Sequence, residues 1–500
     1  MATFSSIKKK TIVGVVRTVE ARYPDEAPYH PDTNYPEYPF NGNISIKPNY
    51  AYNGVRQLLH ALELDNDHFD TPQWNPLGYL IKPGMTILIK PNFVLSRHFS
   101  GKDVYSIITH PSVLRAIADY CWIALKGSGK IIIADAPQYN CNFEELINTT
   151  HLDSVHNFFA SFPGTMVEVL DLRTYWSKSM HFPSCIQPLP GDAKGSITVN
   201  LGKSSALYKY PQPSKLYGAV FHRQETIAHH TGEKQEYEIS GTILNADVMI
   251  SVPKLKVHKK VGVTLNLKGL VGTSTNKNLL VHYTLGSPSE GGDQYPDNLL
   301  TGRQRMAIKF ERWMYDNFLA KNTVFHERIH RFIYGFLYLK IFAHIGFGIP
   351  PEKRMLDTGN WYGNDSAWRM VVDLAKIIYF ADKEGQLQTQ CPRRLFSIVD
   401  GIIGGEKNGP LTPDPNYAGV LIGGENLLAV DIVAARLMGF DPLKIKQFTM
   451  LDKEYDFGAR RLDEIEIKSD WTEISQGLEG KSNRFLAFKP HPGWIGYIEI

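Results

Sequence analysis

The chain contains few cysteines, and their spacing excludes several kinds of site. Its 500 residues include only four, Cys121, Cys141, Cys185 and Cys391. No two of them form a Cys-x-x-Cys pair, so neither a zinc ribbon nor a locally encoded iron–sulfur cluster is expected. Four cysteines are also too few for a disulfide scaffold in a chain of this length, which favours a reducing, cytoplasmic location.

The sequence also lacks long apolar runs and a large net charge. No clean apolar stretch reaches the roughly 18 residues that a spanning helix needs. The run Thr11–Val16 ends at Arg17 without a small-residue cleavage site, so it indicates a first strand and not a secretory signal. The 54 Lys and Arg against 51 Asp and Glu give a net charge of +3, and nucleic acid is not an expected partner.

Two common catalytic and nucleotide-binding motifs are missing. No Gly-x-Ser-x-Gly elbow occurs, which disfavours a nucleophilic hydrolase. The glycine-rich segment Gly401–Gly409 ends without Gly-Lys-Ser/Thr and does not match the dinucleotide fingerprint, so ATP or NAD binding has no motif to support it.

Short apolar runs alternate with helical patterns along most of the chain. Strands are predicted at 85–90, 130–135, 246–252, 395–400 and 419–422. Between the first two, Thr109-His110-Pro111 offers an N-cap residue and a proline near the first turn of a helix. Strand, helix and strand with short links predict an α/β fold, with a parallel or mixed sheet flanked by helices and interrupted by long insertions.

The segments differ enough to propose a division of the chain. We predict an N-terminal strand, loop and helix extension at 1–80, an α/β core at 81–294 and 366–500, and a basic, aromatic helical insertion at 295–365. The stretch 173–240 shows no clear hydrophobic repeat, so no helix or strand is assigned to it. Residues 301–354 hold ten Lys and Arg against four acidic residues. Two interpretations stay open: a helical insertion with solvated charges, or an amphipathic contact with an anionic membrane surface or a protein partner.

Polar residues follow several predicted strands, where parallel α/β sheets bind ligands. Lys90 and Asn92 follow the first, and Asp135 ends the next. Asp400 follows a later strand and precedes glycines that we expect to be flexible. The convergence of these segments on one rim predicts a small-molecule site.

The segment Lys254–Lys268 is the most informative. It holds six groups that could be cationic. Lys254, Lys256 and His258 stand at every second position, so an extended chain places their side chains on one face. Such a face suits phosphate or carboxylate. The residues predicted to bind an anionic substrate are Lys90, Asn92, Lys254, Lys256, Thr264 and Lys268. Proton transfer is assigned to His258 or His110, with Asp400 or Asp431 orienting the imidazole.

A divalent metal is a further hypothesis. His282, with Asp293 and Asp431, offers nitrogen and oxygen ligands of the kind such ions take. Histidines scattered through a sequence more often end as hydrogen-bonded polar groups, and that alternative stays open.

Several of these segments resemble the family known as domain of unknown function 362. The matching pieces are residues 89–92, 109–111, 247–258, 262–269, 282, 399–401, 409–410 and 429–442. The resemblance implies an α/β domain with a shared site at Lys90, Asn92, Lys254, Lys256, His258 and Lys268, but implies no reaction. Some members carry ferredoxin-like cysteine motifs, which this chain lacks, so no iron–sulfur cluster is expected.

Two functions follow from these patterns. The first is an enzyme acting on a phosphorylated or carboxylated small molecule through a Lys/His-rich site. The alternative is a non-catalytic anion-binding or scaffold protein, peripheral to a membrane, that contacts its partner through 301–354.

Overall fold

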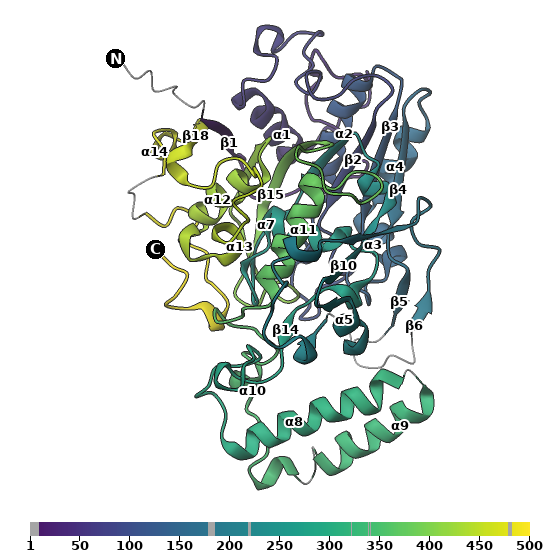
Figure 1. The fold of residues 1–500 in the computed structure, drawn as a ribbon. Coiled ribbons are helices and arrows are strands. Elements are labelled where there is room, and N and C mark those ends of the chain that lie inside the picture. The colour runs from purple at the N-terminus through teal and green to yellow at the C-terminus, as the bar shows by residue number, and fades with distance from the viewer. Residues whose placement is uncertain are drawn as a thin grey trace, which may run out of the picture.

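The central element of the chain is a large mixed sheet. The computed structural model describes residues 10–178, 186–218, 222–321, 323–338, 340, 342–478 and 483–500, so Cys185 lies outside the described residues. Eleven strands form the sheet, in the order β18-β1-β17-β15-β11-β2-β3-β4, with β12 and β16 paired to β15 and β13 paired to β12. Figure 1 shows the two ends of this order, β18 on the left and β4 on the right. The predicted α/β class is confirmed.

Strands from both ends of the chain take part in this sheet. Their bounds are β1 (Thr11–Arg17), β2 (Thr86–Pro91), β3 (Lys130–Asp135), β4 (Met166–Asp171), β11 (Val248–Val252), β12 (Lys254–His258), β13 (Gly262–Val263), β15 (Arg394–Glu406), β16 (Asp414–Asn416), β17 (Val420–Gly424) and β18 (Ile465–Ser469). Along the eight-strand path, β17 alone runs antiparallel to both of its neighbours. The other seven are mutually parallel, which brings their carboxyl ends to one edge.

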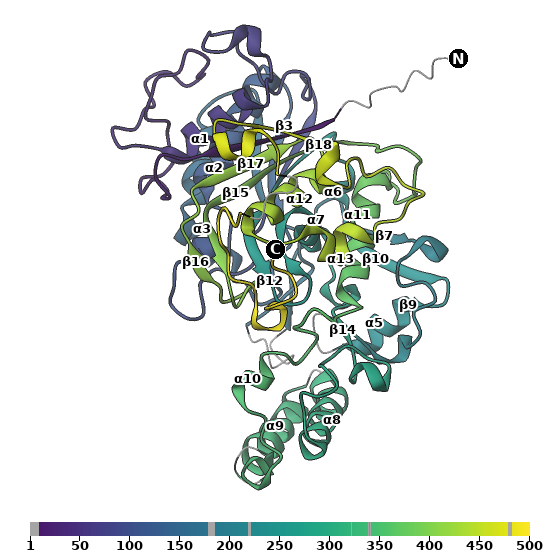
Figure 2. The ribbon, with the colours of Figure 1, turned by 90° about the vertical axis from the view of Figure 1, so that its left-hand side faces the viewer.

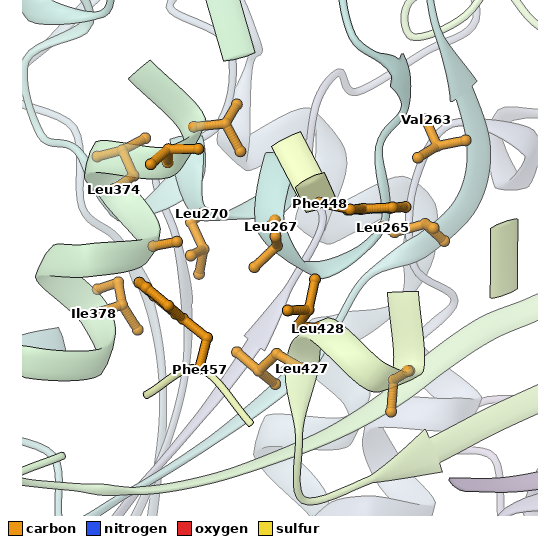
Figure 3. Packing of buried hydrophobic residues seen from close by; sticks show 14 of the residues in the cluster. Val263, Leu265, Leu267, Leu270, Leu374, Ile378, Leu427, Leu428, Phe448 and Phe457 are labelled. Atoms are coloured by element: carbon orange, nitrogen blue, oxygen red, sulfur yellow. The ribbon is translucent and has the colours of Figure 1, made fainter. Parts of the chain in front are cut away.

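Helices cover both faces of the sheet, because alternate strand residues point to opposite sides. Ile87 and Ile89 pack with α1 (Tyr50–Ala61), α2 (Pro111–Leu125) and α4 (Leu152–Ala160). Leu88 lies in the other core, with α7 (Leu265–Gly269), α11 (Ala367–Phe380) and α12 (Leu427–Met438); Figure 3 shows part of this packing. No helix in the described part of the chain is both long and apolar enough to cross a bilayer.

The stretch without a firm period, 173–240, consists of short elements. It holds β5 (Tyr175–Ser177), β6 (Ile186–Pro188), β7 (Ser196–Asn200), β8 (Leu216–Tyr217), α5 (Arg223–His229), β9 (His230–Thr231) and β10 (Lys234–Ser240). None of them has more than seven residues, and the strands pair only within small sheets, as β8 does with β14 (Tyr283–Thr284). Elements this short cannot show a clear hydrophobic repeat. The remaining helices of the core are α3 (Phe143–Thr150), α6 (Gly241–Leu244), α13 (Lys446–Thr449) and α14 (Thr472–Ser475).

Residues 301–354 form a helical hairpin. Its elements are α8 (Gly302–Asn317), α9 (Val324–Phe332), a π-helical turn at Ile333–Tyr338 and α10 (Pro351–Arg354). In both Figure 1 and Figure 2, α8 and α9 lie side by side at one end of the molecule, away from the central sheet.

One local expectation was wrong. The glycines after Asp400 are not flexible, because β15 continues to Glu406 and they permit close packing: a Cβ at Gly405 would lie 2.4 Å from the Ser106 carbonyl oxygen. The cap of α2 is His110, whose Nδ1 accepts a hydrogen bond from the Ser112 amide. Thr109 instead donates its hydroxyl to the Val252 carbonyl and so links the start of α2 to β11.

Candidate functional site

A cavity of about 450 Å³ lies beyond the carboxyl ends of β2 and β3. Its walls come from the segments after those strands, from β12 and α7, and from α8 of the hairpin. The titratable residues that line it are Asp135, Tyr139, Tyr217, Lys256, His258, Lys259, Lys260, Lys268, Lys277, His282, Tyr283, Glu311, Arg312, Tyr315 and Asp357. The cavity therefore stands where a parallel sheet is expected to bind its ligand.

The structure brings together half of the residues proposed from the sequence. Those that line the cavity are Asn92, Lys256, His258, Thr264, Lys268 and His282. Lys90 lies directly behind the wall, with its ammonium 2.9 Å from the carboxylate of the lining residue Asp135. The others, His110, Lys254, Asp293, Asp400 and Asp431, are buried elsewhere.

Helix α7 presents two polar groups to the cavity. Thr264 caps its start and Lys268 follows one turn later, so both lie on the same side of the helix. The Thr264 hydroxyl is buried without a hydrogen-bond partner, and Lys268 makes no ion pair or side-chain hydrogen bond within the part of the chain that is described. Burial lowers the pKa of Lys268 to about 7.

Asp431 holds α7 in this position. Its carboxylate accepts hydrogen bonds from the amides of Asn266 and Leu267 at 2.8 and 2.9 Å. Between these amides and Thr264, the backbone of Leu265 adopts a left-handed φ of 49°. A non-glycine residue in this region carries strain, so the two amide contacts stabilise a turn that the chain would not otherwise prefer. Asp431 is thus a structural anchor of α7, and burial raises its pKa to about 7.

The other lysines of the cavity donate to uncharged acceptors. Lys256 donates to the Ile107 carbonyl at 2.7 Å, Lys277 to the Val271 and Ser274 carbonyls at 2.9 Å, and Lys260 to the Thr358 carbonyl and the Asn360 side chain. Burial lowers the pKa of each. In the ranges that are described, no ion pair joins any of them, or Lys259, to a carboxylate. The cavity therefore contains an excess of amines that an anion would help to protonate.

The two histidines of the cavity have different tautomers. The Nδ1 of His258 accepts from the Lys260 amide at 3.1 Å, so the ring carries its proton on Nε2. The Nδ1 of His282 lies 2.7 Å from the Leu280 carbonyl, which can only accept, so this ring carries its proton on Nδ1. Burial and the neighbouring lysines lower both pKa values well below 6.5. His258 is thus a neutral donor, and His282 has a free lone pair on Nε2.

A salt bridge supports the wall formed by β2 and β3. Besides pairing with Lys90, Asp135 accepts from the Phe93 amide at 2.7 Å. Gly272 lies against this pair, and a Cβ there would come within 1.9 Å of the Asp135 carboxylate. The pair and the glycine fix the loop that presents Asn92.

The hairpin supplies a wall that the sequence did not predict. Arg312 of α8 pairs with Asp357 at 3.2 Å and lies over the rings of Tyr217, Tyr283 and Tyr315. Its Nε is buried without a partner. None of the site residues predicted from the sequence lies in 295–365, and the basic composition of that segment is the only local pattern that points to Arg312. Lys277 was missed as well, because it follows no predicted strand.

His110, Lys254 and Asp400 form a closed network away from the cavity. The Asp400 carboxylate lies 2.6 Å from the Tyr23 hydroxyl, 2.9 Å from the Lys254 ammonium and 3.0 Å from the His110 amide. The His110 ring stacks on Tyr23 with centroids 4.1 Å apart, and burial and Lys254 lower its pKa well below 6.5. These residues stabilise the fold where β12 meets β15, and none of them lines the cavity.

The metal hypothesis finds no matching ligand set. Asp293 is occupied by the amides of Thr284 and Asp365 and by the Ser366 hydroxyl, and Asp431 by α7. Over the described ranges, no three His, Cys, Asp or Glu side chains come together as a metal site would require. His282, Asp293 and Asp431 are therefore not brought together as ligands: the carboxylates of Asp293 and Asp431 accept hydrogen bonds in different places, and only His282 keeps a free nitrogen lone pair.

Comparison with known proteins places part of the chain in a family. Neither a curated protein nor a solved structure matches the chain. Residues 200–436 match the family described as "Domain of unknown function (DUF362)". This range includes β12, α7 and α8, and hence most of the cations of the cavity. Through residues 200–436, the chain carries a domain of the DUF362 family.

Proposed function

We propose that the protein is an enzyme whose cavity binds a phosphorylated or carboxylated small molecule and transfers a proton to or from it. One observation carries the proposal. Thr264 and Lys268 present two donors from one helical turn, without a partner in the described protein, to a cavity rich in amines. Buried polar groups in native proteins are normally paired, and an oxyanion would pair both.

The size and charge of the cavity fit such a ligand. About 450 Å³ falls within the roughly 300–1,000 Å³ typical of small-molecule sites. An anion beside Lys268 favours its charged form, so binding raises the pKa of this lysine from about 7. Between about pH 7 and pH 10, binding is therefore accompanied by proton uptake, and the affinity falls as the pH rises.

The two imidazoles provide complementary groups for proton transfer. His282 accepts a proton at Nε2, while His258 donates a hydrogen bond from Nε2 to an oxygen that becomes negative. The neighbouring ammonium groups stabilise that charge. This assignment differs from the one based on the sequence, which gave proton transfer to His258 or His110. Hydrogen bonding makes His282 the base, since the Nδ1 of His258 is already used by the Lys260 amide.

Binding is tested by thermal shift of the full chain with inorganic phosphate, phosphorylated sugars and small carboxylates. We expect at least one to stabilise the protein, with the effect lost in Lys268→Met. A ligand at 100 times its Kd adds about 2.7 kcal/mol. Stabilisation of the same size in Lys268→Met would place the anion elsewhere and overturn the proposal.

Catalysis is tested on whichever ligand binds. Transfer of solvent deuterium into a carbon-bound position, followed by NMR, is expected for the unmodified chain and is expected to be lost in His282→Gln with binding retained. His258→Gln is expected to slow the exchange without abolishing it. A ligand that binds at Lys268 but neither exchanges nor reacts would favour the alternative, a non-catalytic anion-binding protein.

A further inference from the structure

The hairpin exposes large apolar side chains along both of its helices. On α8, Met306, Phe310 and Trp313 are 55%, 37% and 51% exposed. On α9 and the turn that follows it, Phe325, Phe332 and Phe336 are 68%, 63% and 48% exposed. Within each set the residues are three, four or seven positions apart, so each forms one stripe along its helix. These six residues are called the aromatic face.

Ring contacts join the two stripes around the end of the hairpin. The ring of Trp313 lies 5.8 Å from that of Phe310 and 5.7 Å from that of Phe318. Phe318 in turn lies 6.3 Å from the ring of His326, which contacts Phe325 at 5.6 Å. The stripes are therefore parts of one connected apolar surface. On most monomers, by contrast, exposed apolar residues are scattered singly.

Basic side chains accompany the aromatic face, and the acidic side chains of α8 and α9 are already paired. Glu311, Asp316 and Glu327 form ion pairs with Arg354, Arg223 and Arg331. By contrast, the exposed Lys321 and Arg328 make no ion pair within the described ranges. Arg328 lies three residues after Phe325 and four before Phe332, within the stripe itself, and the Lys340 ammonium lies 5.7 Å from the ring of Phe336.

The hairpin also lies at one end of the molecule, where a flat surface can contact it. Figures 1 and 2, viewed 90° apart, both place α8 and α9 at the end of the molecule, with the sheet and its covering helices on the other side. A planar partner can contact both helices without meeting the core.

We infer that the hairpin docks on the surface of an anionic lipid bilayer, with the aromatic face among the headgroups and acyl chain ends. Exposed Trp and Phe beside unpaired basic residues is the pattern of helices that lie in the membrane interface. Lys321, Arg328 and Lys340 contact the lipid phosphates. A second copy fits less well, because twofold contact between two such faces brings the unpaired cations of both copies together.

Cosedimentation of the full-length protein with vesicles tests this inference independently of any ligand of the cavity. We expect binding to vesicles of phosphatidylcholine with about 30% phosphatidylserine, little binding to phosphatidylcholine alone, and release at about 0.5 M salt. Phe325→Ser with Phe332→Ser, and Lys321→Gln with Arg328→Gln, are expected to weaken binding. Each cation contributes about fivefold, so the second pair loses roughly 25-fold.

Matched controls change residues of the same kind outside the hairpin. Tyr417→Ser removes an exposed aromatic ring and Lys453→Gln an exposed cation, and both are expected to bind vesicles as the unmodified chain does. Unchanged thermal melting of the hairpin variants shows that they fold. The inference is overturned if anionic vesicles do not bind, or if the Phe325/Phe332 variant binds normally. It is equally overturned if that variant instead abolishes a dimer in vesicle-free solution.

Discussion

Lys268 and Lys277 give the sharpest test of the cavity, because burial lowers the pKa of both to about 7 but only one of them has protein partners. Lys277 donates to two carbonyl oxygens. Lys268 donates to none within the described chain. We predict that Lys268→Met stabilises the ligand-free protein at pH 7, and that Lys277→Met is less stable than Lys268→Met at every pH.

The magnitude follows from the pKa values. A lysine with an ordinary pKa of 10.5 and a native pKa of about 7 destabilises the native state by up to about 5 kcal/mol when protonated, at roughly 1.4 kcal/mol for each tenfold change. Because the effective dielectric constant is about 20 even at buried sites, the cost is smaller than this limit, and we expect about 2–3 kcal/mol. Between pH 7 and pH 10.5 the unfolded chain holds a proton that the native chain has lost, so the native state gains stability as the pH rises. Lys268→Met removes this slope, and its advantage disappears near pH 10.5.

Lys277→Met removes the same slope and also leaves the Val271 and Ser274 carbonyls without a donor. Each unpaired carbonyl costs about 1–2 kcal/mol, so this variant is expected to be about 2–4 kcal/mol less stable than Lys268→Met throughout. Urea unfolding near pH 7 and pH 10.5, followed by tryptophan fluorescence, measures both differences. A Lys268→Met protein less stable than the unmodified chain at pH 7 would refute the reasoning. Equal stability of the two variants near pH 10.5 would refute it as well.

Three further substitutions test the roles assigned to single residues, two at the cavity and one in the network of Asp400. Thr264→Val is expected to weaken anion affinity about tenfold in calorimetric titration, with no loss of thermal stability, since its hydroxyl bonds nothing in the described protein. Asp400→Asn leaves the buried Lys254 ammonium without its carboxylate, and urea unfolding is expected to show a loss of about 3–5 kcal/mol. Asp431→Ala unpairs two amides of α7 and is expected to cost about 2–4 kcal/mol, with faster amide hydrogen exchange in α7.

Much of the sheet could be predicted because buried strands leave a clear local pattern. The apolar runs at 85–90, 130–135 and 246–252 coincide closely with β2, β3 and β11. Strand direction leaves no such pattern, and the antiparallel course of β17 could not be read from its residues. The glycines after Asp400 misled for a related reason. They indicate flexibility in isolation, but here they allow neighbouring chain segments to approach β15 closely.

The site was harder to predict than the fold, since the fate of a charged residue depends on distant partners. Lys254 and Lys268 belong to one basic segment, and the sequence predicts the same role, anion binding, for both. Lys254 meets a carboxylate 146 residues away, in Asp400, and becomes part of a structural pair. Lys268 meets no carboxylate and lines the cavity. Only the folded arrangement separates the two, because ion pairing over such distances has no local pattern.

Helix α8 connects the cavity with the aromatic face. Glu311, Arg312 and Tyr315 line the cavity, while Phe310 and Trp313 are exposed. At 100° per residue, the mean direction of the first three lies nearly opposite that of the other two. One helix of 16 residues therefore meets a ligand on one side and, under our inference, lipid on the other. Because an α-helix is a rigid element, any shift of α8 that seats the exposed rings in a bilayer would also displace Arg312, and we predict that membrane contact and ligand affinity are coupled reciprocally.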